Sequence, residues 1–149
     1  MLTCRLLKLH CYISDESEDD EVFIKRNKEK LWPQSEKYKQ MSGGAEIVNV
    51  DINDIERGAS IELELWDYDT WSPNDKLGIF KMVVDERGGP FTSDLIVEKG
   101  SGEPVFAIKL VVFHIGKHQM RDTEHLVKRC LFFFTGQQVA ILIDNALAL

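Results

Sequence analysis

Three aspartates within residues 66–78 are the side chains in this sequence best placed to do chemistry. Asp67 and Asp69 are two residues apart, so an extended backbone points both carboxylates to the same side. Pro73 helps the following loop to curl back, which lets Asp75 face the other two. Carboxylates held this close repel one another in a partly desolvated loop, and a hard divalent cation removes that repulsion. The spacing therefore predicts a cation site, and the competing interpretation is a solvated acidic turn without an ion.

A second acidic stretch strengthens the case for an ion. Six of the seven residues from 15 to 21 are acidic, which no strand interior tolerates, so this stretch is expected to be a loop. Neither this loop nor the loop of residues 66–78 contains His or Cys, so every side-chain ligand would be an oxygen. Calcium prefers six to eight oxygen ligands, so such a site favours calcium. The backbone carbonyl of Tyr68 and water would complete the shell. The EF-hand is a poor match, because its central Gly and terminal Glu are missing.

The elements that must position these loops alternate with period two, which is typical of half-buried strands. In the first, Leu7, Leu9, Cys11 and Ile13 share one face. Gly78 is expected to permit a tight entry into the strand after the aspartates. The expected strands cover residues 7–13, 22–25, 31–32, 46–52, 61–66, 77–84, 92–97 and 105–115, with breaks at 33–44 and 87–90. Eight short strands without a clear helix predict an all-β, antiparallel β-sandwich.

The segment LELWDYDTWSPNDKLG resembles the third ion-binding loop of C2 domains, in which a strand ends in WDxD and DxxG opens the next strand. The resemblance extends from residue 4 to about residue 116. It implies an eight-stranded sandwich with calcium between two loops, and often docking to anionic lipid. Carried over residue by residue, it implies ligands at the following positions: Asp67, Asp69, Asp75, Asp20 with Asp19 as the alternative register, and Asp15. The spacing from Asp15 to Asp20 is one residue shorter than usual, and the proline of the family's DPYV segment is missing.

Two surface features suggest where a membrane would be contacted. Trp71 and Pro73 lie at the expected tip of the loop, where a tryptophan either enters a membrane interface or folds back onto the sandwich. The second feature is a run of basic residues that either meets anionic headgroups or forms a solvated face. Its members are Lys25, Arg26, Lys28, Lys30, Lys37 and Lys39.

Length and composition bound the remaining expectations. The chain has 149 residues, suiting one sandwich domain over residues 1–118 and an apolar extension over 119–149. The extension packs on its own domain, forms an interface or anchors to a membrane. The net charge of -7 argues against nucleic acid as a partner. Three cysteines without paired spacing, and no signal peptide, indicate a cytoplasmic protein, including the periphery of a membrane.

No enzyme motif is found, so we expect a non-catalytic module. The first hypothesis is a calcium-binding module that docks to an anionic phospholipid membrane or to a protein partner. The second is a metal-independent interaction domain that uses the C-terminal apolar segment.

Overall fold

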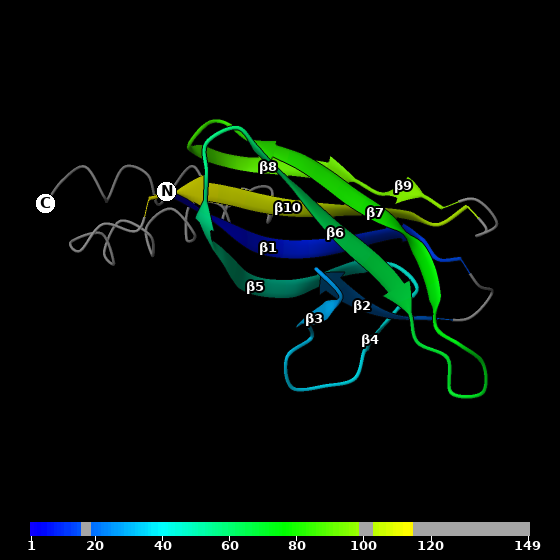
Figure 1. Ribbon diagram of the computed structural model, residues 1–149. Coiled ribbons are helices and arrows are strands. Elements are labelled where there is room, and N and C mark those ends of the chain that lie inside the picture. Colours follow the sequence, from blue (N-terminus) through cyan, green and yellow to red (C-terminus); the bar gives the residue numbers. More distant parts are fainter. Residues whose placement is uncertain (16–18, 99–102, 115–149) are drawn as a thin grey trace, which may run out of the picture. The chain divides into compact units, whose positions relative to one another are not determined.

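The computed structural model describes residues 1–15, 19–98 and 103–114, and every regular element in these ranges is a β-strand (Figure 1). No helix in the described part of the chain is long and apolar enough to cross a membrane. The strands are β1 (Leu2–Ile13), β2 (Asp20–Arg26), β3 (Glu29–Trp32), β4 (Lys39–Met41), β5 (Gly44–Ile55), β6 (Ala59–Asp67), β7 (Asp75–Val84), β8 (Gly88–Asp94), β9 (Ile96–Val97) and β10 (Val105–Phe113).

The strands form two antiparallel sheets. The four-stranded sheet has the order β5-β1-β10-β8. The six-stranded sheet has the order β3-β2-β6-β7-β9, with β4 also paired to β2. The predicted all-β sandwich is therefore confirmed, with eight strands of four or more residues and two shorter ones.

Three details of the strand prediction were wrong. The expected break at residues 33–44 contains β4, and the expected break at 87–90 is the beginning of β8, where Gly88 and Gly89 adopt φ of 118° and 119°. The single strand expected over 92–97 is divided between β8 and β9, which belong to different sheets. Glycine and proline mark breaks in most sequences, but an edge strand such as β8 tolerates both.

The core lies between the sheets, and β6 shows the cleanest alternation. Ile61, Leu63 and Leu65 are buried there, as the sequence predicted. In β1 the predicted single parity was wrong, because a register shift between Leu6 and Lys8 moves the core-facing set from even to odd positions. The core-facing residues of β1 are Leu2, Cys4, Leu6, Leu9 and Cys11, whereas Ile13 is exposed.

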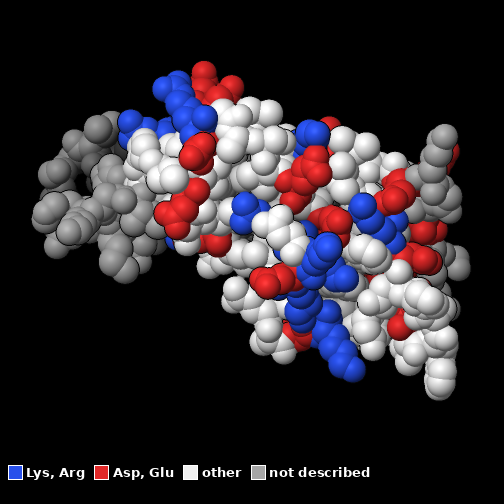
Figure 2. Space-filling view, viewed as in Figure 1, with Lys and Arg blue, Asp and Glu red and all other residues white. Residues whose placement is uncertain are grey.

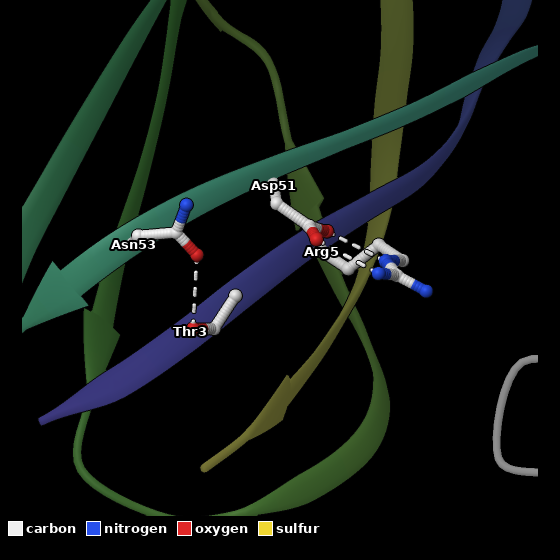
Figure 3. Close-up of polar contacts among 4 residues, drawn as sticks. All are labelled: Thr3, Arg5, Asp51 and Asn53. Atoms are coloured by element: carbon white, nitrogen blue, oxygen red, sulfur yellow. Dashed lines mark hydrogen bonds and ion pairs between the residues drawn. The ribbon is translucent and has the colours of Figure 1, made fainter. Parts of the chain in front are cut away.

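Polar contacts fix the pairing of β1 with β5. The Arg5 guanidinium donates two hydrogen bonds to the Asp51 carboxylate, at 2.5 and 2.7 Å, and the Thr3 hydroxyl donates to the Asn53 side chain at 3.1 Å (Figure 3). Arg5 and Asp51 are register partners, so this ion pair and the backbone ladder specify the same alignment.

Two of the three cysteines lie on the core face of β1 as free thiols. Burial raises the pKa of Cys4 to about 12 and that of Cys11 to about 11, which keeps both thiols protonated and unreactive at neutral pH. The expected extension over residues 119–149, with Cys130, lies outside the described residues, and residues Met1–His114 form one compact unit.

Candidate metal centre

The two acidic loops meet at one end of the sandwich because β2 begins beside the end of β6. Val22 and Asp67 are register partners. The Glu21 N–H donates to Asp67 Oδ1 at 2.7 Å, and the Tyr68 N–H donates to the Glu21 carbonyl at 2.8 Å. Residues 14–15, 19–21 and 67–75 therefore form a single region, here called the acidic pole (Figure 1).

Two carboxylates of the acidic pole are buried. Asp20 is 0% exposed and Asp67 is 7% exposed. Asp67 continues the alternation of β6, so its side chain lies on the face that buries Leu63 and Leu65. One oxygen of each carboxylate accepts a backbone hydrogen bond, since Asp20 Oδ2 accepts from the Asp15 N–H at 2.8 Å. Buried carboxylates are costly unless charge or hydrogen bonds compensate them, and these backbone hydrogen bonds supply part of that compensation.

Asp15 adds an oxygen whose hydrogen-bonding capacity is unused. Its Oδ1 is buried and has no hydrogen-bond partner among the residues that the structure describes. A carboxylate oxygen in this condition loses its hydration without gaining a donor. The backbone N–H of the same residue donates to the buried Asp20 carboxylate, so Asp15 is anchored to the first of the two buried aspartates through its main chain.

Asp69 and Asp75, the two other aspartates of the second loop, are less buried than Asp20 and Asp67. The Asp69 N–H donates to Asn74 Oδ1 at 3.0 Å, which closes the loop, and Asp75 is the exposed register partner of Asp67. Asn74 was not singled out from the sequence, although asparagine is a common turn residue for this reason. Within the described ranges, no three His, Cys, Asp or Glu side chains gather closely enough to hold a metal. The donor chemistry fits calcium, but these carboxylates are not assembled into a complete ligand set.

Gly78 has a different role from the one expected. Its φ is not among the positive values, and a Cβ built on it would clash with the carbonyl oxygen of Ile96. Glycine is therefore needed so that β9 can approach β7, with which it pairs at Gly78 and Ile79. A clash between two strands far apart along the chain leaves no mark in the local sequence.

The ring of Tyr68 holds the 37–38 segment against the acidic pole. It stacks on Tyr38 with ring centroids 5.1 Å apart, and Lys37 Nζ lies 5.8 Å from its centroid. A hydrogen bond to Glu21 raises the pKa of Tyr38. The sequence singled out Tyr68 only for its backbone carbonyl, and nothing local pointed to Tyr38.

Trp71 projects from the tip of the loop. It is 98% exposed, so the alternative in which it folds back onto the sandwich is wrong. Pro73 beside it is also exposed. An exposed tryptophan next to a proline at a loop tip is an unusually large apolar surface for a side chain in water.

The basic run on β2–β4 is partly engaged by its own chain. Lys25 Nζ lies 4.3 Å from the Trp66 ring centroid, and Lys39 pairs with Glu36 at 2.8 Å. Figure 2 shows basic side chains grouped with acidic ones on the face that carries these strands. Both interpretations of the basic run, contact with anionic headgroups and a solvated face, therefore remain predictions.

No family model and no curated protein match the chain. Among solved structures it is similar to one described as the structure of a C2 domain, with a TM-score of 0.44 and 17% identity over 74% of this chain and 99% of that one. It is also similar to a C2 domain of plant extended synaptotagmin 1, with a TM-score of 0.43 and 12% identity over 78% and 95%. The expected resemblance to C2 domains is thus met as a likeness of fold, and any ligand must be argued from this chain's own residues.

Proposed function

We propose that this C2-like domain is a non-catalytic calcium-binding module whose ion is held between the two loops of the acidic pole. The observation that supports the proposal is the burial of two carboxylates, Asp20 and Asp67, on separate loops that the Glu21–Asp67 hydrogen bond holds together. A bound cation would compensate the cost of removing these two charges from water.

Each predicted ligand has a distinct place in this proposal. Asp20 and Asp67 supply the two buried carboxylates, and Asp15, whose backbone N–H contacts Asp20, would add its buried Oδ1, which has no partner among the described residues. Asp69 and Asp75, with the Tyr68 carbonyl, would approach from the second loop. Calcium supplies the positive charge that allows these carboxylates to converge, so binding should tighten both loops.

Calorimetric titration and thermal melts of the full chain test the proposal. Calcium at about 100 times its Kd should stabilise the fold by about 2.7 kcal/mol and so raise Tm by several degrees over a melt in chelator. D67N and D69N should each weaken binding, because an amide keeps the shape and loses the charge. D94N, on β8, is the matched control and should bind as the wild type does. Flat calorimetry with coincident melts at millimolar calcium would overturn the proposal.

We further propose that the loaded loops dock to anionic phospholipid membranes through Trp71. The support is its 98% exposure at the tip of the ion-binding loop, together with the amphipathic indole that membrane interfaces favour. Cosedimentation with phosphatidylserine vesicles should then require calcium, and W71A should reduce it while leaving calcium affinity unchanged. Equal vesicle binding by W71A and wild type would contradict this membrane contact.

A further inference from the structure

The outer edge of β7 is paired over only part of its length. On one side β7 pairs with β6 from Asp75 to Val84, but on the other β9 pairs only with Gly78 and Ile79. Among the described residues, no strand continues this pairing along residues 80–84. A strand edge with unused backbone groups is a template for pairing with another chain.

Hydrogen bonds show which backbone groups face this edge. The Leu77 carbonyl accepts from the Glu98 N–H at 3.1 Å, and the Lys81 carbonyl accepts from the Ser93 hydroxyl at 3.1 Å, both on the outer side. The Val84 carbonyl accepts from the Gly58 N–H at 2.7 Å, on the opposite side. Because these directions alternate along a strand, the N–H and carbonyl of Val83 point outward. No hydrogen bond to them is found within the described ranges.

Beside this edge, a groove of about 390 Å³ opens between β7 and β8. Val83 and Phe91 stand at its mouth and are 59% and 41% exposed. Its apolar lining is completed by buried or half-buried side chains: Met82, Val84, Leu110 and Val112. A strand added to β7 would direct every second side chain toward this apolar lining.

The other sheet edges carry features that discourage strand addition. In β8, Pro90 lacks an N–H and follows two glycines with φ near 120°. β3 is only four residues long, and β5 contains register shifts and Asn49 at φ 48°. Edges blunted in these ways rarely pair with other chains, whereas residues 80–84 of β7 contain no proline, glycine or register shift.

The charge around the groove selects among peptides. Three acidic residues line it, Asp85, Glu86 and Asp94, against one cation, Lys81, which pairs with Glu62 at 2.9 Å. A further cation reaches the rim, where Arg57 Nε donates to the carbonyl of Asp85 at 2.7 Å. The lining is net acidic, which complements lysine or arginine flanking an aliphatic residue.

We propose that the β7 edge and this groove bind an extended peptide segment of a partner protein by strand addition. The peptide backbone pairs with Val83, an aliphatic side chain enters the groove, and flanking basic side chains meet Asp85, Glu86 and Asp94. This inference does not depend on calcium and goes beyond the proposed function.

The test is fluorescence anisotropy of the full chain with a labelled seven-residue peptide of alternating lysine and valine. The wild type should bind it, equally with and without calcium. V83P removes the outward N–H while leaving the β6 ladder intact, and should weaken binding about tenfold or more. V83A keeps the N–H and should stay within about threefold. D94N should weaken binding to a smaller extent, although it does not affect calcium.

A second measurement uses the unmodified protein, so its result does not depend on whether V83P folds. The same peptide, N-methylated on alternate residues so that one edge loses its donors, should no longer bind the unmodified protein. A glutamate–valine peptide should bind at least about tenfold more weakly than the lysine one. No binding at about 1 mM peptide, or equal binding of the N-methylated form, would overturn the proposal. So would a homodimer that V83P dissociates, because the occupant of the edge would then be a second copy of this chain.

Discussion

The acidic pole and the β7–β8 groove lie along the same strand and are both acidic, yet they suit different ligands. β7 begins at Asp75 in the pole and ends at Val84 beside the groove (Figure 1). In the pole, Asp20 and Asp67 are buried and accept backbone hydrogen bonds, whereas Asp85 and Asp94 at the groove are exposed. Desolvated carboxylates favour a hard cation, while exposed carboxylates beside unused backbone groups favour a basic extended peptide. We therefore expect burial, rather than charge alone, to decide which kind of ligand each region binds.

The largest expected effect tests whether the two regions share one cooperative core. Phe80 is 0% exposed and lies on β7 between them. F80A should lower the free energy of unfolding by about 3–5 kcal/mol, because it leaves a cavity in the core between the sheets. Urea denaturation measures this loss, and V83A on the exposed face should stay within about 0.5 kcal/mol of wild type. A loss below about 1 kcal/mol for F80A would show that the core relaxes around the site.

A smaller effect, from a substitution at Gly78, should disturb the edge of β7 without changing calcium binding at the acidic pole. G78A places a Cβ against the Ile96 carbonyl oxygen and should displace β9, at about 1–3 kcal/mol. Hydrogen exchange at Ile96 and Glu98, whose N–H groups face β7, should accelerate while calcium affinity stays unchanged. A Cβ added at Gly43 would meet nothing within 4 Å, so G43A is the matched control and should leave exchange unaltered. Unchanged exchange in G78A would mean that β9 tolerates the extra methyl.

Asp51 is a useful contrast to the aspartates of the acidic pole, because an arginine of the same chain neutralises its carboxylate. It receives both hydrogen bonds of Arg5, and the two side chains are 29% and 23% exposed. D51N should cost about 1 kcal/mol in urea denaturation, a modest value because solvent screens the pair. D54N, at an exposed position with φ 56° that asparagine also adopts, should be neutral. A calcium defect in D51N would contradict the separation of this ion pair from the pole.

The smallest effect is a pH dependence outside both regions. Burial, and then the charges of Lys109 and Lys8, hold the pKa of His10 below its ordinary value of 6.5. As the pH falls through 6.5, His10 therefore becomes protonated in the unfolded chain while it is still neutral in the folded protein. Protonation stabilises the unfolded state, so the free energy of unfolding decreases until the pH is below the lower pKa of folded His10. H10Q should reduce the slope of stability between about pH 7 and about pH 5, and K8Q should reduce it partly. An unchanged slope in H10Q would exclude this origin.

Local pattern was enough to predict much of the fold. Alternation of apolar and polar residues indicated the core face of β6 and the all-β class, because that face is set by period-two geometry alone. The same rule failed in β1, where the register shift at Leu6 and Lys8 reverses the parity. It also failed in β8, because an edge strand accepts the glycines and the proline that would interrupt a central one.

For the candidate site, the sequence indicated candidate residues but not how they are arranged. The sequence singled out the aspartates of both loops, and the structure brings those loops together through Glu21 and Asp67. No local pattern indicated that Asn74 closes the second loop, that Tyr38 stacks on Tyr68, or that Trp71 stays in solvent. The Asn74 hydrogen bond, the tyrosine stacking and the exposure of the tryptophan all depend on how the whole loop packs. A short sequence pattern does not specify that packing.

By itself, the amino-acid sequence determined which residues carry charge, which strands have an apolar face and which loops could attract a cation, since these follow from side-chain chemistry and strand periodicity. Only the tertiary structure decided that Asp20 and Asp67 are both buried and that the edge of β7 is left open beyond Ile79 in the described part of the chain. Both outcomes depend on which strands become neighbours. Desolvation of a carboxylate and pairing of a backbone edge are therefore properties of the assembled sheets rather than of any single segment.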